Sequence, residues 1–240
     1  MDHVAKKRSR PAQLRISSEA VYLLAIPIIA FAVAMLAAAD FGVSMVVAPA
    51  YILSQKLSFL TFGQSEYVVQ SLLLIAFCIL MGRPRPIYLF AYCTCLIYGA
   101  VLDLVRLIPI FDPAVCPPGS MAMPLRLLFF TAGTLLTALS VAMFFRTYLY
   151  PQMYDFFVKG VSFHYGIDRT KFKLIFDISC LAAAVALTLL FFGRFVGVGV
   201  GTILMTFING PLIGAIGRLL DKRLEIAPRF VKAARRFELN

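Results

Sequence analysis

Four polar side chains of this sequence lie within long apolar runs at spacings that allow them to act together. Asp103 and Arg106 are three residues apart in LDLVR, and Glu66 and Gln70 are four apart in EYVVQ. Either spacing puts both members of a pair on one helix face. Because ionisable groups at membrane depth are costly, they commonly face a cavity or a partner. All four are therefore candidates for binding a substrate or a coupling ion. The simpler alternatives are a local ion pair at Asp103 and an exposed helix start at Glu66.

Two polar residues in the C-terminal half extend this set of candidates. Asp177 has Lys173 one helical turn before it, so a local ion pair is again the alternative to a binding role. Asn209 is followed by Gly210 and Pro211. A helix break at this point would expose backbone groups to a ligand at mid-membrane, as in the discontinuous helices of transporters. Asn209 would then be a binding residue.

Small residues indicate where helices of this chain approach closely. Gly210 and Gly214 have the four-residue spacing of a packing face, which is the alternative to a helix break at Pro211. Ala30 and Ala34 form a similar stripe, either for packing within the chain or for docking another subunit. The other glycines expected at helix contacts are Gly99 and Gly201.

The sequence contains no familiar catalytic or metal-binding pattern. It has two histidines, and it lacks a phosphate-binding loop, a zinc spacing and a hydrolase nucleophile elbow. Four of the five cysteines fall in apolar runs, which leaves Cys116 without a disulfide partner. We therefore expect no enzymatic activity, no cofactor and no metal.

Membrane-spanning helices are the elements that must position these residues. The 240 residues are 61% hydrophobic and 15% charged, with a mean hydropathy of +0.87, which is more apolar surface than a soluble core can bury. A span takes roughly 20 apolar residues. Suitable runs lie near residues 20–39, 66–81, 87–108, 123–145, 172–192 and 195–217. The predicted fold class is an all-α membrane protein with six transmembrane helices.

The placement of charge predicts the orientation of the spans. With both termini in the cytoplasm, nineteen of the 23 Lys and Arg residues lie on the cytoplasmic side, as the positive-inside rule requires. Arg126, at the start of a span, is expected to snorkel to the lipid headgroups. The basic residues are spread over ends and loops, so the net charge of +11 does not indicate a nucleic-acid partner.

The two halves of the chain show a weak internal repeat with an offset of 111 residues. The matching residues are Gly82-Arg83 with Gly193-Arg194, Gly99 with Gly210, and Glu66 with Asp177. Three spans per half predict an inverted repeat of the kind found in transporters. The expected organisation is a basic cytoplasmic leader (1–19), a first three-span repeat (20–108), an outer loop (109–122), a second three-span repeat (123–217) and a basic cytoplasmic tail (218–240).

Two further apolar segments, 41–62 and 149–168, are too irregular for spans because they contain prolines and glycines. Each is expected to be an interfacial helix or a re-entrant segment, and the interfacial form is favoured. If the first segment re-enters the membrane, Ser44, Pro49 and Gln55 become site candidates.

Several runs of the sequence resemble one family of membrane proteins. They are FGVSMVVAPAYILSQKL followed by TFGQSEYVVQ, then YGAVLDLVR, KFKLIFDISCL and GVGVGTILMTFINGPLIG. Over residues 20–220 the chain resembles the YczE/YitT-like bacterial integral membrane proteins. The resemblance implies a small multi-pass protein of the bacterial cytoplasmic (inner) membrane, and it assigns no catalytic residues.

The expected function is that of a small-solute transporter or permease subunit with a site between the two halves, near Asp103, Asp177 and Asn209. The expected partners are the lipid bilayer, an unidentified small solute, and a protein partner or a second copy of the chain. The alternative is a non-transporting accessory or regulatory protein that binds another membrane complex through its glycine and alanine faces. An intramembrane enzyme ranks third, because the polar residues form no evident catalytic set.

Overall fold

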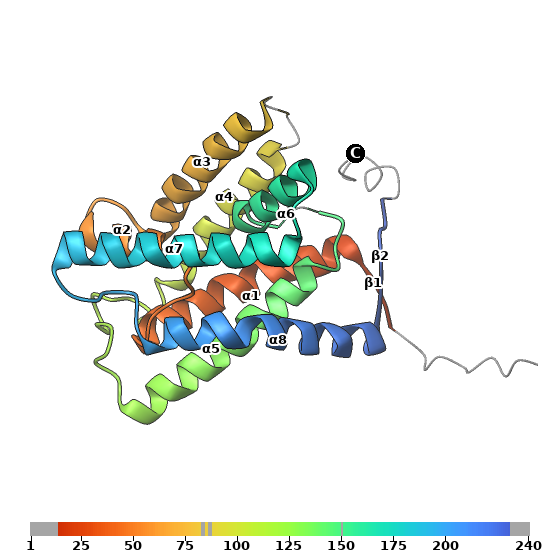
Figure 1. The fold of residues 1–240 in the computed structure, drawn as a ribbon. Coiled ribbons are helices and arrows are strands. Elements are labelled where there is room, and N and C mark those ends of the chain that lie inside the picture. Colours follow the sequence, from red (N-terminus) through yellow and green to blue (C-terminus); the bar gives the residue numbers. More distant parts are fainter. Residues whose placement is uncertain (1–13, 83–84, 86–87, 150, 231–240) are drawn as a thin grey trace, which may run out of the picture.

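The computed structural model of this protein describes residues 14–82, 85, 88–149 and 151–230, and most of these residues are helical (Figure 1). The elements of the described part are β1 (Leu14–Ser17), α1 (Ser18–Ala39), α2 (Ala48–Lys56), α3 (Phe62–Met81), α4 (Tyr88–Val105), α5 (Met123–Phe144), α6 (Met153–Tyr165), α7 (Arg169–Phe192), α8 (Val200–Arg223) and β2 (Leu224–Ala227). The leader up to residue 13, Arg83 of the first Gly-Arg turn and the tail from residue 231 lie outside the described residues.

Six of these helices are long and apolar enough to cross a membrane, namely α1, α3, α4, α5, α7 and α8. This confirms the prediction of an all-α protein with six candidate spans, as expected of a multi-pass membrane protein. Large apolar side chains such as Leu72, Leu190 and Phe207 are exposed on the helix surfaces. Exposed apolar surface of this kind suits contact with lipid.

Helix α3 begins earlier than the expected residue 66, because the sequence supplies a cap further upstream. The Thr61 hydroxyl accepts a hydrogen bond from the Gln64 amide at 3.1 Å, and the Gln64 side chain accepts one from the Thr61 amide at 3.0 Å. This reciprocal capping box satisfies amides that the first helical turn leaves unpaired. Glu66 therefore lies one turn inside the helix and not at its exposed start.

Helix α8 begins at Val200 and not near residue 195. Gly193 ends α7 in the left-handed conformation, with a φ of 64°. The Thr188 hydroxyl then accepts a hydrogen bond from the Val196 amide at 2.8 Å, which holds the connecting segment in a non-helical form. Among the glycines at the start of the apolar run, Gly197 and Gly199 thus precede the last span.

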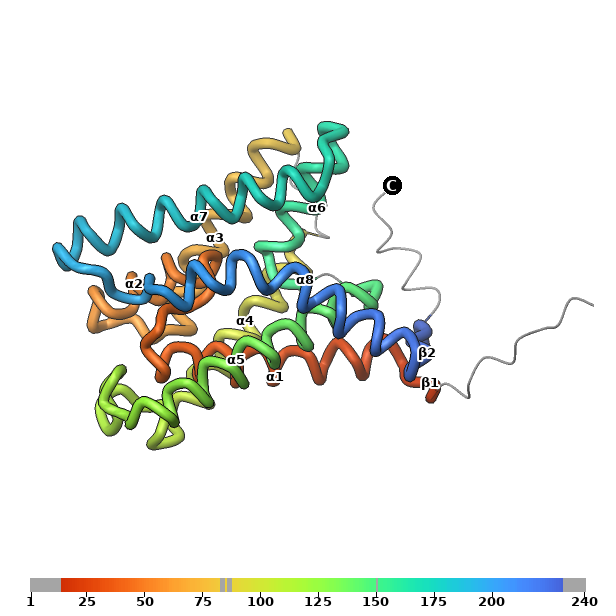
Figure 2. The backbone as a smooth tube through the Cα atoms, turned by 60° about the horizontal axis from the view of Figure 1, so that its bottom comes forward, coloured from red at the N-terminus to blue at the C-terminus, as the bar shows by residue number. Residues whose placement is uncertain are grey.

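Helix α1 is the most buried of the six long helices and runs antiparallel to α5, beside which it lies in Figure 2. Ser140 donates a hydrogen bond to the Ala25 carbonyl at 2.8 Å, and Arg126, near the start of α5, donates to the Ala39 carbonyl at the end of α1 at 2.8 Å. Ala30 and Ala34 are buried in the same core. The alanine stripe therefore packs within the chain and offers no docking face. Arg126, which was expected to snorkel, instead binds the end of α1.

The packing of the other helices follows a pattern that recurs in the two halves. Helix α1 packs on α4, and α5 packs on α8; α2 packs on α7, and α3 packs on α6. Helices α3 and α4 also pack closely, because Gly63 and Gly99 face each other: a Cβ at Gly99 would lie 2.9 Å from the Gly63 carbonyl oxygen. Among the described residues, α7 and α8 do not form a comparable packed pair.

The short helices α2 and α6 occupy the two irregular segments. Helix α6 packs on α3, where Phe77 contacts Phe156 with ring centroids 5.0 Å apart. Gly160 of α6 makes room for the Phe77 ring, since a Cβ at that position would lie 2.5 Å from it. Both short helices have buried residues and pack among the long helices. Whether they are interfacial or re-entrant stays a prediction.

The chain between α1 and α2 is held against the start of α8. The Val43 amide donates to the Gly197 carbonyl at 3.0 Å, and the Gly201 amide donates to the Phe41 carbonyl at 2.8 Å. The Thr202 hydroxyl donates to the Val43 carbonyl at 2.8 Å. These bonds fix the first turn of α8 to the segment 41–45.

A two-stranded parallel sheet, which the sequence did not predict, joins the two ends of the described chain. Strands β1 and β2 pair in a register that runs from Leu14 opposite Leu224 to Ser17 opposite Ala227. The start of α1 and the end of α8 consequently lie together at one end of the molecule (Figure 1).

Candidate functional site

A cavity of about 540 Å³ lies inside the bundle, between α1, α5, α6, α7 and α8. The segment 44–47 and Tyr98 of α4 complete its lining. The lining surface is mostly apolar, and polar side chains from several helices also contribute to it. This size and composition are typical of a site for a small molecule.

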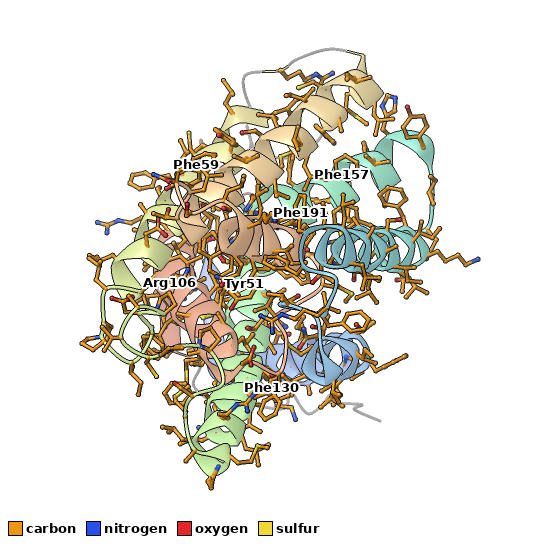
Figure 3. The ribbon with its side chains drawn as sticks, turned by 90° about the vertical axis from the view of Figure 1, so that its left-hand side faces the viewer. Tyr51, Phe59, Arg106, Phe130, Phe157 and Phe191 are labelled. Atoms are coloured by element: carbon orange, nitrogen blue, oxygen red, sulfur yellow. The ribbon has the colours of Figure 1, made fainter. Side chains whose placement is uncertain are left out.

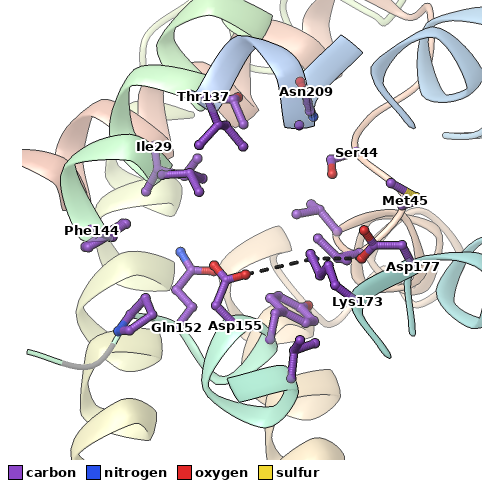
Figure 4. A pocket seen from close by; sticks show the side chains of 18 of the residues that line it. Ile29, Ser44, Met45, Thr137, Phe144, Gln152, Asp155, Lys173, Asp177 and Asn209 are labelled. Atoms are coloured by element: carbon purple, nitrogen blue, oxygen red, sulfur yellow. Dashed lines mark hydrogen bonds and ion pairs between the residues drawn. The ribbon is translucent and has the colours of Figure 1, made fainter. Parts of the chain in front are cut away.

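A charged group of three residues lies on one side of the cavity (Figure 4). The Lys173 ammonium is 2.7 Å from the nearer Asp177 oxygen and 3.8 Å from an Asp155 oxygen. Both acidic side chains are largely buried, at 12% and 19% exposure. The local pair expected between Lys173 and Asp177 is therefore present, and it forms part of the cavity wall. The cavity lining also includes Arg169, so its charged side chains are two acids, Asp155 and Asp177, and two bases, Arg169 and Lys173.

Three buried polar atoms on the cavity wall have no hydrogen-bond partner among the described residues. They are the amide oxygen of Asn209 and the hydroxyls of Thr137 and Tyr98. Asn209 and Thr137 lie across the cavity from the charged group in Figure 4. Because leaving such a group unpaired costs about 1–3 kcal/mol, a polar solute that pairs with these atoms would gain that energy.

Glu66 is fully buried directly behind the cavity wall, so the prediction of an exposed helix start was wrong. One oxygen, Oε2, accepts hydrogen bonds from Gln70 at 3.0 Å and from the Tyr154 hydroxyl at 2.8 Å. Gln70 in turn accepts from the Met153 amide at 3.0 Å. Burial raises the pKa of Tyr154 well above its usual value, so this hydroxyl stays protonated and remains a donor. Tyr154 also lines the cavity and therefore connects it to Glu66.

Asp103 and Arg106 lie outside the cavity, at the other end of α4, and they perform structural roles. Asp103 accepts hydrogen bonds from the Thr61 hydroxyl at 2.5 Å and from the Gly63 amide at 2.8 Å, which caps the start of α3. Arg106 lies over the Phe62 ring, 5.4 Å from its centroid, and in Figure 3 it is seen at the edge of the bundle. Burial lowers the pKa of this guanidinium. The structure therefore brings Asp177 and Asn209 to one cavity and does not bring Asp103 to it, contrary to the expectation.

Helix α8 continues without a break through Asn209, Gly210 and Pro211, so the helix break that was the alternative to packing is not formed. A proline within a membrane helix is tolerated when its surroundings satisfy the freed carbonyl. Gly201 packs as expected, since a Cβ there would lie 2.7 Å from the Phe41 carbonyl oxygen. A Cβ at Gly210 would meet no atom of the described residues within 4 Å, so its face makes no helix contact within the described chain.

Sequence reasoning missed most of the polar residues of the cavity wall, among them Tyr98, Thr137, Tyr154 and Asp155. Hydroxyl groups are common in apolar helices, and only the fold decides which of them lack a partner. One signal was present for Tyr98. The offset of 111 residues that separates Gly99 from Gly210 also separates Tyr98 from Asn209, and both of these side chains reach the cavity.

Comparison with known proteins gives a family and no function. A search of curated proteins and a search of solved structures each found no match to this chain. Residues 16–218, which include all six long helices except the last turn of α8, match one family model. The chain therefore belongs to the family of unknown function DUF6198.

Proposed function

We propose that this protein is a transporter of a small polar solute, or the solute-binding subunit of one, and that the cavity beside α7 and α8 is its binding site. The observation that carries the proposal is the cavity itself. It brings the Lys173 ion-pair group and three unpaired polar atoms together at membrane depth. Polar groups in such a location commonly mark the path of a substrate or an ion.

The order of the helices supports an inverted repeat. Each half has a long helix, a short helix and two long helices, as α1–α4 and as α5–α8. The third helix of each half ends on a left-handed glycine, Gly82 with a φ of 66° and Gly193 with a φ of 64°. An odd number of spans per half turns the second half upside down relative to the first. Transporters with such repeats bind their substrate near mid-membrane, between the halves.

The two halves differ in one helix contact, and this difference supports alternating access. Helices α3 and α4 are in close contact at Gly63 and Gly99. The corresponding pair, α7 and α8, is apart, and the counterpart of Gly99, which is Gly210, is free of contacts within the described chain. The cavity lies on the side of the open pair. If the halves exchange conformations, α7 closes on α8 and the α3–α4 pair opens, so that the site faces the other side.

The charge distribution supports a cavity that faces the cytoplasm in this conformation. With both termini cytoplasmic, α7 enters the membrane from that side at Arg169, and the cavity is lined by the first part of α7, from Arg169 to Asp177. On the outer side, the segment 41–45 is bonded to the first turn of α8 and closes the path. The pairing of β1 with β2 supports one side for both termini.

The experiment that tests the proposal is a ligand screen on the purified protein, followed by uptake measurements in proteoliposomes. A ligand that binds the folded state raises its stability, by about 2.7 kcal/mol at one hundred times Kd. We expect amino acids, polyols or organic acids among the stabilising solutes, and we expect Asp177→Asn and Asn209→Ala to remove the effect. Arg15→Gln is the matched control, because Arg15 forms an exposed ion pair with Glu225 far from the cavity. A hit that also stabilises both cavity variants, or that is not taken up into vesicles, would contradict the proposal.

The free face of α8 favours one alternative, an accessory protein that binds another membrane complex. No other helix of the described chain packs at Gly214, and Gly210, one turn before it, lines the cavity. For such a protein, Gly214→Leu would abolish copurification of the partner complex, and Asp177→Asn would have no effect on it. For a transporter, Asp177→Asn would instead abolish solute uptake.

A further inference from the structure

Glu66 is a buried acid that neither the helix packing nor the cavity wall explains. It is fully buried in α3, and one of its oxygens, Oε1, has no hydrogen-bond partner among the described residues. Its other oxygen receives both available donors, from Gln70 and Tyr154. A group whose only role was to join α3 to α6 would do so equally well as a neutral amide. The ability of a carboxyl group to bind and release a proton is therefore the property that distinguishes Glu66 from such an amide.

No basic side chain forms an ion pair with Glu66 in the part of the chain that the structure describes. The titratable groups that face it are Tyr154 from α6 and Cys95 and Tyr98 from α4. On α2, the charged residue Lys56 donates to the Phe191 carbonyl at 3.1 Å, away from Glu66. An ionised carboxylate without a counter-charge in a low-dielectric interior has a large desolvation free energy, and protonation removes the charge that causes it. The unpartnered Oε1 is the open position for that proton.

The position of Glu66 connects it to the solute site. Tyr154 donates to Glu66 and lines the cavity, and Tyr98, which interacts electrostatically with Glu66, also lines it. Tyr154 therefore bridges the acid and the cavity. Glu66 is also one turn from the start of α3, the end of that helix opposite to the cavity's cytoplasmic side. An opening of the α3–α4 pair would give it access to the outer side.

We propose that Glu66 is the proton-binding site through which a proton gradient drives solute transport. This inference rests on the proposed transport function. Glu66 would take a proton from water when the α3–α4 pair is open, forming the O–H bond on Oε1. It would release the proton to water by way of the cavity when α7 and α8 are apart. The step moves one proton in and the same proton out, so it needs no oxidant or other reactant.

The first test reads the proton directly, without any solute. Infrared difference spectra of the purified full-length protein, recorded as the pH is changed, should contain the carbonyl stretching band of a buried carboxylic acid that appears and disappears with pH. The band should be lost in Glu66→Gln and kept in Asp177→Asn, the matched control. A band that survives in Glu66→Gln, or its absence from the wild type over the whole pH range of the folded protein, would overturn the assignment.

The second test separates this inference from the proposed function. In proteoliposomes, with a neutral solute from the ligand screen, one pH unit across the membrane should raise the accumulation ratio about tenfold at one proton per solute. Glu66→Gln should bind the solute and lose the whole dependence on the gradient. If uptake by the wild type does not depend on the pH gradient, the proposed proton site is refuted and the proposed transport function is not. Absence of uptake would overturn transport, and the infrared band would then decide whether Glu66 binds a proton.

A third variant covers the case in which Glu66→Gln fails to fold. Tyr154→Phe keeps the aromatic ring and removes only the hydroxyl that donates to Oε2. Loss of a donor should shift the carbonyl band of Glu66 and move its titration to higher pH. An unchanged spectrum in this variant would overturn the proposal.

Discussion

Replacement of Gly63 by alanine should loosen the α3–α4 contact, on which the closed half of the molecule depends. A Cβ at Gly63 would overlap the Gly99 carbonyl oxygen and would lie 2.6 Å from an Asp103 carboxylate oxygen. Both atoms are held in position, because the first belongs to the backbone of α4 and the second caps the start of α3. The two helices must therefore separate to accommodate the methyl group.

The expected cost follows from this geometry. Overpacking of one methyl group against atoms that cannot move costs about 1–3 kcal/mol. For a chain of this size, each kcal/mol lowers the Tm by about 2–4 °C. Gly210→Ala is the matched control, since Gly210 has nothing within 4 Å in the described chain. Alanine is favoured over glycine in a helix interior by about 1 kcal/mol, so the two variants should shift the Tm in opposite directions.

Thermal unfolding in detergent, followed by far-ultraviolet circular dichroism, is a suitable assay because most of the described residues are helical. The wild type and both variants should be compared at the same detergent and protein concentrations. A Tm of Gly63→Ala at or above that of the wild type would refute the close contact of α3 and α4. A fall in Tm with Gly210→Ala as large as that with Gly63→Ala would refute the difference between the two halves.

Three further substitutions test the roles of charged residues, with unfolding in mixed micelles as the common measurement. Asp103→Asn should lower the free energy of unfolding by about 2 kcal/mol, because two hydrogen bonds lose their ionised acceptor, and it should leave solute binding unchanged; weaker binding would return Asp103 to the site. Arg126→Gln should cost about 1.5–3 kcal/mol, since the guanidinium donates to two carbonyls at the end of α1; a neutral effect would favour the snorkelling model. Lys173→Met should destabilise by less than the 3–5 kcal/mol typical of a broken buried pair, because Lys173 is about one-third exposed, and adding Asp177→Asn should recover part of the loss; an additive double variant would show that the two residues do not interact.

The sequence predicted the spans well because the requirement of about 20 apolar residues per span is a local property of the chain. It predicted helix starts less well. The cap at Thr61 and the turn at Gly193 depend on single residues that hydropathy averaging hides. The pairing of β1 with β2 has no local signal at all, since the strands are joined only through the folded bundle.

The candidate site was predicted in part. Asp177 and Asn209 were found because an acid or an amide is rare within an apolar run, and both line the cavity. Asp103 was equally rare, but its partners are Thr61 and Gly63 of another helix, and spacing along the chain reports only partners on the same helix. Tyr98 is identifiable in the sequence only through its match to Asn209 in the predicted repeat.

The bonds at the two ends of α8 determine which helix is free to move. Its first turn is tied to the segment 41–45, and its last turn continues into β2, which is paired with the strand that leads into α1. Helix α8 is thus tied at both ends to chain segments that adjoin α1. If the cavity closes as proposed, the movement therefore falls to α7, which packs on α2 at one end and on α6 at the other. In that movement α8 would keep its place, and α7 would rotate about its contacts with the short helices α2 and α6.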